Sequence, residues 1–399
     1  MTRSAPTRTL RRVPEGARVA TPHPRAAPSP ALDGAGRPGR AAALPSIVLL
    51  CLVSLPGRGA GQTQLPPAPE LDARQAAAEA APLFADEVPL TLELFVDLSW
   101  LEDERPTEEE VVGLLRLEGA DGRVADHPVQ VRTRGIFRNE SRNCSMPPLR
   151  LDVPTGQMEG TVFEGQDKLK LVLPCRIGRD DYQTLVLREY LAYRMLGVLT
   201  AVSYRVRLVD LTIRDTAGDM EPVEAHGFLI EDEEQMAARV RAAVSDFETF
   251  FPQGMEPEQA TVVSLFQFMI GNTDWSPVAD HNATLLWDDQ ARYLTVPYDF
   301  DFSGIVEAPY ASPDPELPIR SVRERLYRGF CWERVDLEAV RTRFLEARPR
   351  LEELWSEQAL LDDGARQRGL DYLETFYRVL ESPGTWRREV LEACRGMPG

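Results

Sequence analysis

Lysine is almost absent from this sequence of 399 residues. Lys and Arg together number 45, and only Lys168 and Lys170, both in the segment DKLKLVL, are lysines. The two residue types differ where a compact ammonium group is needed in a tight, partly buried site. In a sequence that otherwise uses Arg, the two lysines are therefore candidates for chemistry rather than for solubility. Their survival by chance on the surface is the alternative.

Histidine and cysteine are also scarce, with four His and five Cys. No Cys-x-x-Cys spacing occurs, so a zinc site of the usual kind is not expected. One cysteine, Cys51, lies in an apolar segment near the N-terminus. The other four allow three disulfide connectivities, and proximity in the sequence favours the pairs Cys144–Cys175 and Cys331–Cys394 in an exported chain.

The apolar run LPSIVLLCLVSLP, within residues 41–56, is short and flanked by proline. It is too short for a comfortable membrane span. A basic lead, a short apolar core and a small-residue exit instead predict a secretory signal. Residues 1–62 are therefore interpreted as an N-terminal extension with a signal peptide, and residues 63–85, rich in Pro and Ala, as a linker. The expected location is the periplasm, the cell surface or the extracellular space, without stable membrane insertion.

Positive charge is scarce in the rest of the chain. The total formal charge is -18, and residues 1–62 contribute nine Arg against Glu15 and Asp33, a local +7, which leaves -25 for residues 63–399. Such an acidic body argues against nucleic acid or anionic lipid as the main partner. Hydrophobic content of 43% and charged content of 27% are typical of a globular protein with a large core.

Strand patterns dominate residues 86–230 and helical patterns dominate residues 231–399. The predicted strands are 89–97, 111–117, 129–134, 168–173, 204–213 and 226–230, with one helix at 182–196. The predicted later helices are 236–244, 257–270, 335–358 and 364–380, around a hairpin of strands 283–287 and 293–298. This order predicts an α+β protein with two unequal lobes. The N-terminal lobe is expected to be antiparallel and β-rich with one key helix, and the C-terminal lobe mostly helical with the hairpin.

The stretch 262–304 is expected to hold the functional centre. A loop carries Asp274, His281 and Asn282, and the hairpin that follows delivers Asp299 and Asp301 just past its second strand. Carboxylates and an amide that converge this way suit Mg²⁺ with nucleotide phosphates, and a further carboxylate can accept the proton of an attacking hydroxyl. His281 is expected to form a hydrogen bond in the loop. The alternative is an acidic surface loop and a solvated strand end.

The segment VRTRGIFRNESRN places Arg132 and Arg134 on one face of a strand, with Gly135 in the turn after them. A glycine turn flanked by Arg can cover phosphates with backbone N–H groups and guanidinium groups. Glycine turns are common, however, and an ordinary hairpin is the favoured interpretation of this segment from its residues alone.

Glu189 lies on the apolar face of the predicted helix 182–196. A buried carboxylate needs a partner, because an unpaired buried charge costs several kcal/mol. The nearest upstream cations of a suitable kind are Lys168 and Lys170, which share one face of their strand. A purely structural ion pair is the alternative.

In this order, the segments resemble the spore-coat CotH family of atypical, secreted protein kinases. The resemblance covers about residues 88–305 and rests on RTRGIFRNES, KLKLVL, DDYQTLVLREYLAYRML, GNTDWSPVADHN and VPYDFDFSG. It implies a bilobal, atypical protein-kinase-like fold. It also implies transfer of the γ-phosphate of ATP, with Mg²⁺ or Mn²⁺, to a Ser/Thr hydroxyl of a protein substrate by a monomeric enzyme.

The resemblance also implies roles for individual residues. The implied catalytic residue is Asp274, the implied metal ligands are Asn282, Asp299 and Asp301, and the implied nucleotide-binding residues are Arg134, Lys168, Lys170 and Glu189. Two other functions stay open. An exported pseudokinase or surface scaffold would bind without turnover, which suits a compartment poor in ATP. A two-carboxylate glycosidase fits Asp274 and Asp299 but leaves the lysines and Glu189 unexplained.

Overall fold

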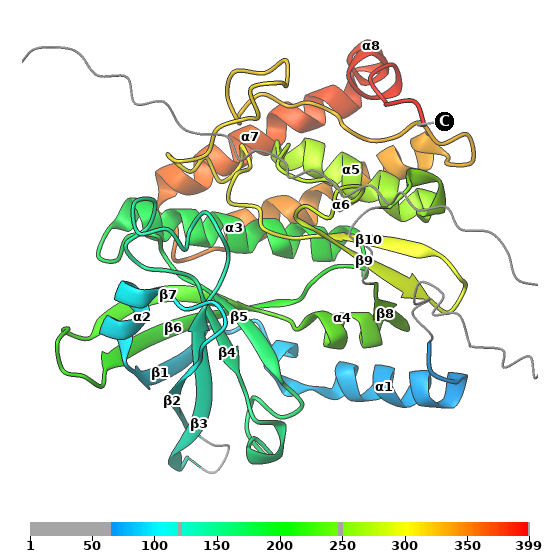
Figure 1. Ribbon diagram of the computed structural model, residues 1–399. Helices are drawn as coiled ribbons and strands as arrows, with labels where there is room; N and C mark the ends of the chain where they lie inside the picture. Colours follow the sequence, from blue (N-terminus) through cyan, green and yellow to red (C-terminus); the bar gives the residue numbers. More distant parts are fainter. Residues whose placement is uncertain (1–64, 119–121, 246–249, 398–399) are drawn as a thin grey trace, which may run out of the picture. The chain divides into compact units, whose positions relative to one another are not determined.

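The computed structural model describes residues 65–118, 122–245 and 250–397, all within the unit Gly59–Gly399. The predicted signal segment lies outside the described residues. The helices are α1 Ala68–Ala80, α2 Leu98–Glu104, α3 Asp180–Leu199, α4 Glu233–Arg239, α5 Pro257–Ile270, α6 Leu337–Ser356, α7 Asp363–Glu381 and α8 Pro383–Trp386 (Figure 1). The strands are β1 Leu90–Val96, β2 Val111–Glu118, β3 Val124–Thr133, β4 Leu149–Asp152, β5 Lys168–Val172, β6 Val206–Asp215, β7 Val223–Ile230, β8 Ala242–Val244, β9 Ala283–Asp288 and β10 Tyr293–Pro297. Short 3₁₀ turns are η1 Pro82–Phe84, η2 Thr155–Gln157 and η3 Pro252–Gly254, and η4 Arg387–Leu391 is a π-helical turn.

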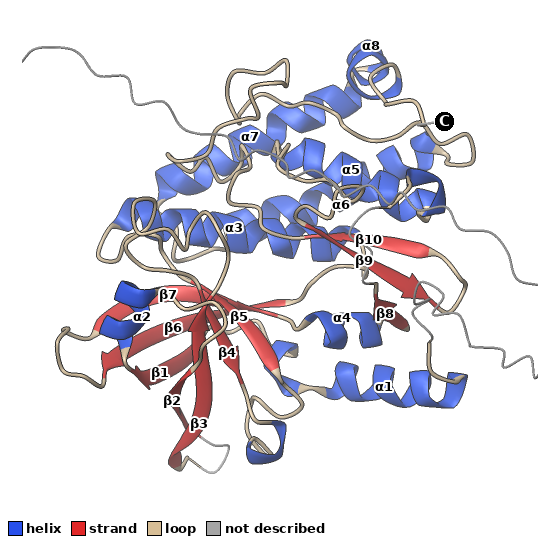
Figure 2. Cartoon of the chain, viewed as in Figure 1, coloured by secondary structure: helices blue, strands red, loops and turns tan. Residues whose placement is uncertain are grey.

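Seven strands form a closed barrel in the order β1-β2-β3-β4-β5-β7-β6 (Figure 2). Neighbouring strands are antiparallel except β1 and β6, which pair in parallel with Leu90 opposite Val209. Alternate side chains fill the barrel, among them Leu92 from β1 and Leu169 and Leu171 from β5. This alternation is the period-2 pattern that identifies the strands in the sequence.

The closed barrel shows that the predicted bilobal kinase-like fold is wrong. The prediction has an antiparallel β-rich lobe followed by a mostly helical lobe, whereas the described residues form a mixed barrel with eight α-helices. Closure requires β1 to pair with β6, more than 100 residues later in the chain, and strand periodicity carries no information about that pairing. The later half also contains the sheet β10-β9-β8 and a long stretch, residues 298–336, without helix or strand.

A second core lies outside the barrel, where α3 packs against β7, α5 and α6 (Figure 1). The outward side chains of two barrel strands belong to this core, Val172 from β5 and Phe228 from β7. Tyr193 of α3 lies 5.6 Å from Phe228, measured between ring centroids. Because side chains alternate along a strand, Lys170 faces the same side as Val172, toward the helices.

The segment predicted as a linker differs from that prediction. It contains α1 and η1, and Leu83 of η1 is fully buried in the barrel core. Arg205 of the loop before β6 donates a hydrogen bond of 2.9 Å to the carbonyl of Ala78. Alanine favours helix, so the Ala-rich composition that suggests a linker also supports α1.

Both predicted disulfides are confirmed: Cys144 is bonded to Cys175, and Cys331 to Cys394. Disulfides are typical of proteins that fold in an oxidising compartment, which fits an exported chain. In the part of the chain that the structure describes, no helix is both long and apolar enough to cross a membrane.

Removal of the Cys331–Cys394 bridge by a double Cys→Ser substitution is expected to lower the free energy of unfolding. The bridge closes a loop with a sequence separation of 63 residues, and the entropy of such a loop in the unfolded chain corresponds to about 4 kcal/mol. Urea unfolding of the oxidised wild type and the double variant measures the loss. Equal midpoints for the two proteins would contradict the pairing, and non-reducing peptide mapping would confirm it.

Candidate functional site

The loop between α5 and β9 fixes the carboxylate of Asp274. Helix α5 ends at Ile270 and is capped by Gly271, which has a left-handed backbone with φ 67°, as helix ends often require. The side-chain amide of Asn282 donates to the carbonyl of Asp274 at 2.8 Å and to its Oδ2 at 3.2 Å. The expected hydrogen bond of His281 is present, with Nε2 at 2.8 Å from Asp274 Oδ1. The Asp274 side chain remains 40% exposed, so it is oriented by two partners and still reachable.

The hairpin delivers two further carboxylates. Asp299 has a left-handed backbone with φ 61° and donates its N–H to the hydroxyl of Tyr193 at 2.9 Å. Asp301 is buried and accepts a hydrogen bond of 3.0 Å from Tyr310. Burial, followed by the negative charge of Asp299 and a smaller contribution from Asp274, raises the pKa of Asp301 to about 7. The three carboxylates therefore share one electrostatic environment.

The partner of Glu189 is Arg138, and the prediction that it pairs with a lysine is wrong. Glu189 is 2% exposed, and its Oε2 lies 3.7 Å from Nη1 of Arg138. Burial raises the pKa of Glu189 well above its ordinary value, the charges of Asp301 and Asp299 add to this effect, and Arg138 opposes it. Arg138 is itself buried and donates to the carbonyl of Leu173. One buried guanidinium thus compensates two buried carboxyl groups.

A small cavity of about 10 Å³ adjoins these groups and is lined by Arg138, Glu189, Asp301 and Tyr310, among others. This volume is close to the minimum for one water molecule. The Nε of Arg138 has no hydrogen-bond partner among the described residues. The cavity is therefore about large enough for a single water molecule.

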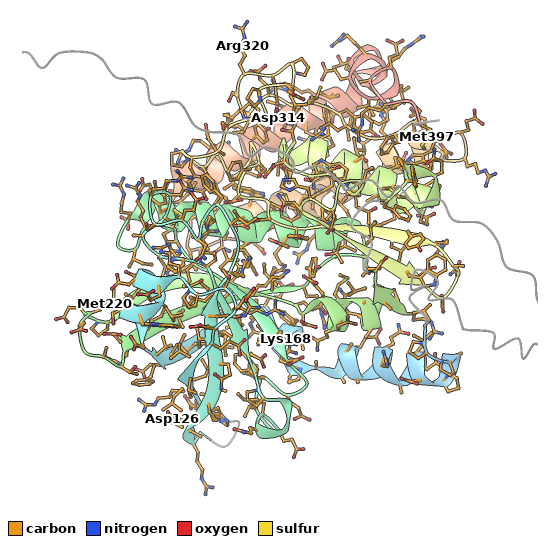
Figure 3. The ribbon with its side chains drawn as sticks, viewed as in Figure 1. Asp126, Lys168, Met220, Asp314, Arg320 and Met397 are labelled. Atoms are coloured by element: carbon orange, nitrogen blue, oxygen red, sulfur yellow. A yellow bond between two sulfur atoms is a disulfide. The ribbon has the colours of Figure 1, made fainter. Side chains whose placement is uncertain are left out.

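The structure separates the two lysines. Lys170 is largely buried, its Nζ lies 2.5 Å from Oε1 of Glu233 and 4.8 Å from the ring centroid of Tyr298, and the chain continues from Tyr298 directly to Asp299. Burial lowers the pKa of Lys170, Glu233 opposes this shift, and the positive charge of Arg134 contributes to it. Lys168 lies at the exposed start of β5, 3.8 Å from Asp167 (Figure 3). Only Lys170 therefore faces the hairpin.

Arg134 contributes positive charge to the same region. Its charge acts on Glu189, Lys170 and Tyr298, and its buried Nε has no hydrogen-bond partner among the described residues. The turn that follows uses Gly135 with φ 79°, a backbone conformation that glycine adopts without steric cost. Arg132 instead donates to the carbonyl of Thr107.

Seven of the eight predicted site residues therefore lie in one connected region, and Lys168 does not. The seven are Arg134, Lys170, Glu189, Asp274, Asn282, Asp299 and Asp301. Arg138 was not predicted as a site residue. Two signals in the sequence indicate it: Glu189 needs a buried cation, and Arg138 lies inside the motif RTRGIFRNES. Among the described residues, no group of three or more His, Cys, Asp or Glu side chains could hold a metal ion. A cation here would need ligands of other kinds as well.

No protein-family model matches the chain, and no curated protein matches it. The CotH resemblance therefore remains a hypothesis from the motifs.

The substitution Arg138→Met is expected to lower the free energy of unfolding by about 1–3 kcal/mol, because the buried carbonyl of Leu173 loses its donor and Glu189 and Asp301 lose the cation that opposes their raised pKa. Urea unfolding measures the change. Arg142→Met in the same loop is the control, since Arg142 is 78% exposed and pairs with Glu140 at the surface, where a pair is worth at most about 1 kcal/mol. Equal losses for the two variants would show that Arg138 does not compensate buried carboxyl groups.

The raised pKa of Asp301 also predicts a pH dependence of stability. The folded chain holds a proton on Asp301 up to about pH 7, whereas the unfolded chain releases it near pH 4. The folded state thus binds more protons in this window, so the contribution of Asp301 to the free energy of unfolding decreases as pH rises from about 4 to about 7. Urea unfolding across this range should show a steeper loss for the wild type than for Asp301→Asn, and parallel curves would contradict the assignment.

Proposed function

We propose that this chain is an exported, Mg²⁺-dependent phosphotransferase that transfers the γ-phosphate of ATP to a Ser/Thr hydroxyl of a protein substrate. The observation that carries the proposal is the convergence of Asp274, Asn282 and the Asp299/Asp301 pair in one electrostatic environment, with Lys170 against Tyr298 at the end of β10. These side chains, and not the fold, support the assignment, because a fold by itself does not specify a function.

Asp274 is the candidate for the group that accepts the proton of the attacking hydroxyl. Its carboxylate is oriented by Asn282 and His281 and remains partly exposed. A carboxylate in this role must be within hydrogen-bond reach of the hydroxyl that it activates. Phosphoryl transfer otherwise asks the protein mainly to position the reactants and to neutralise charge, and the other residues of the site serve these two purposes.

The donor set fits Mg²⁺ or Mn²⁺ in a nucleotide complex. Mg²⁺ usually takes one or two carboxylates and completes its octahedron with phosphate oxygens and water, so a set of three acidic ligands is not required. Asp299, Asp301 and the side-chain oxygen of Asn282 would hold the ion, since Nδ2 of Asn282 is already bonded to Asp274. The mutual repulsion of Asp299 and Asp301 is the kind of charge concentration that a divalent cation relieves. When bound, the ion would supply positive charge to the phosphates.

Lys170 and Arg134 would supply the protein's own positive charge to the nucleotide. Lys170 is a buried ammonium whose present counter-ion is Glu233, and Arg134 brings a guanidinium group to the same region. Glu189 and Arg138 support this arrangement from within the core, because Arg138 compensates Asp301 as well as Glu189. Their contribution is to hold the carboxylates in place.

The substitutions Asp274→Asn and Asp299→Asn are each expected to abolish measurable phosphate transfer in a radiolabelled ATP assay of the purified full chain. Loss of a general base lowers the rate about 10²–10⁴-fold, and loss of charge stabilisation at the phosphates lowers it about 10²–10³-fold.

Lys170→Met should impair phosphate transfer in the same assay. Lys168→Met, at the exposed start of the same strand, should retain it.

Wild-type turnover in Asp274→Asn would remove the site assignment. Thermal unfolding with and without ATP and Mg²⁺ distinguishes an active enzyme from a pseudokinase or scaffold when it is combined with the transfer assay. A nucleotide that binds only the folded state raises the melting temperature of the protein. A rise without any transfer would support a binding protein that lacks turnover. No rise and no transfer would contradict nucleotide recognition altogether.

A further inference from the structure

Outside the site described above, two arginines from distant parts of the chain converge on one carboxylate oxygen. Oε2 of Glu307 lies 2.7 Å from Nη1 of Arg323 and 3.9 Å from Nη1 of Arg188. Arg188 belongs to α3, whereas Glu307 and Arg323 belong to the stretch between β10 and α6. Two guanidinium groups within 4 Å of one carboxylate oxygen mark a position that favours an anion.

Arg188 is buried to an extent that is unusual for an arginine. It is 5% exposed, Nη1 donates to the carbonyl of Val306 at 3.1 Å, and the buried Nε has no hydrogen-bond partner among the described residues. Its ion pair with Glu307, at 3.9 Å, is too long for a hydrogen bond. A buried donor without a partner is costly, so the guanidinium group of Arg188 is left with unused hydrogen-bonding capacity.

The charges around Arg188 are balanced while Glu307 is in place. Arg368 of α7 and Arg323 both act on Arg188, against the two carboxylates of Glu307 and Asp362. Burial lowers the pKa of Arg188, the repulsion from Arg368 contributes next, and Glu307 opposes the shift. In place of Glu307, a doubly charged anion would compensate the two positive charges of Arg188 and Arg323.

We propose that Arg188 and Arg323 form a binding site for a phosphate dianion, either free or carried as a monoester, in which the Glu307 carboxylate now occupies the place of the ligand. Guanidinium groups match the geometry of phosphate oxygens. Glu307 has a left-handed backbone with φ 58°, which is uncommon for a residue other than glycine. Its side chain is 41% exposed, so the carboxylate can turn into solvent when phosphate binds. The inference does not depend on the proposed phosphotransferase activity.

The test uses inorganic phosphate with the full chain, at constant ionic strength and at a pH of about 8, where the dianion dominates. The melting temperature of the wild type is expected to rise and to saturate with phosphate, in comparison with chloride, because the ligand binds the folded state. Arg323→Gln should lose this rise. Glu307→Gln should show a half-saturating concentration about tenfold lower, because the competing carboxylate is gone.

Arg320→Gln is the matched control. Arg320 lies in the same stretch as Arg323 but projects from the surface (Figure 3), so the phosphate response should be retained. The same response in Lys170→Met would show that the bound phosphate is not at the nucleotide site. A wild type without a saturable response, or equal responses in the Arg323→Gln and Arg320→Gln variants, would overturn the proposal.

A second arm replaces inorganic phosphate with a phosphoserine-containing peptide and its unphosphorylated form. Tighter binding of the phosphopeptide than of inorganic phosphate identifies a phosphorylated side chain as the ligand. Tighter binding of inorganic phosphate identifies the free ion. Arg323→Gln must weaken either response, or the proposal fails.

Discussion

The buried guanidinium of Arg138 is the interaction on which the candidate site depends. It lies 3.7 Å from Glu189 of α3, donates to the carbonyl of Leu173 after β5, and carries the positive charge that opposes the raised pKa of Asp301. Three chain segments that are distant in sequence therefore meet at one cation. An isolated carboxylate costs several kcal/mol in such surroundings, so the position of Asp301, and with it the end of the hairpin, is linked to the position of this loop.

The loop that carries Arg138 is fixed from two sides. The disulfide Cys144–Cys175 joins it to the segment before α3. The ring of Phe137 packs edge-on against Phe302 at 5.2 Å and in a tilted orientation against Tyr310 at 5.5 Å, measured between ring centroids. These contacts act on the same stretch that holds Asp301. The covalent bridge and the aromatic contacts thus confine the guanidinium to the place where the carboxyl groups need it.

The local elements were predictable from the sequence, whereas their long-range partners were not. Period-2 alternation identifies β1 and β5, and helical spacing identifies α3 and α5, because both patterns reflect burial within a few residues. Barrel closure through β1 and β6 depends on pairing between remote strands, so the predicted antiparallel β-rich lobe did not include the parallel pair that closes the barrel. Disulfide pairing was predictable because only four cysteines needed partners.

The candidate site shows the same division. Asp274 and Asn282 lie in one loop, so their contact follows from local sequence. The partner of Glu189 does not, since burial on a helix face establishes the need for a cation and not its identity. The scarcity of lysine suggested Lys168 or Lys170 as the partner of Glu189. The partner in the structure is the guanidinium group of Arg138. The rarity of lysine therefore led correctly to Lys170 at the edge of the candidate site, but the predicted contact between a lysine and Glu189 was wrong.

The surroundings of Lys170 account for a lysine in a chain that otherwise uses arginine. Its ammonium lies over the ring of Tyr298 at 4.8 Å, within 5.7 Å of the ring centroid of Tyr204, and against the Glu233 carboxylate. A compact cation satisfies two aromatic faces and one carboxylate at once, whereas a planar guanidinium needs more space and more acceptors. No such constraint acts on the exposed Lys168. Of the two lysines, therefore, only Lys170 is specified by its environment, and that environment is the edge of the candidate site.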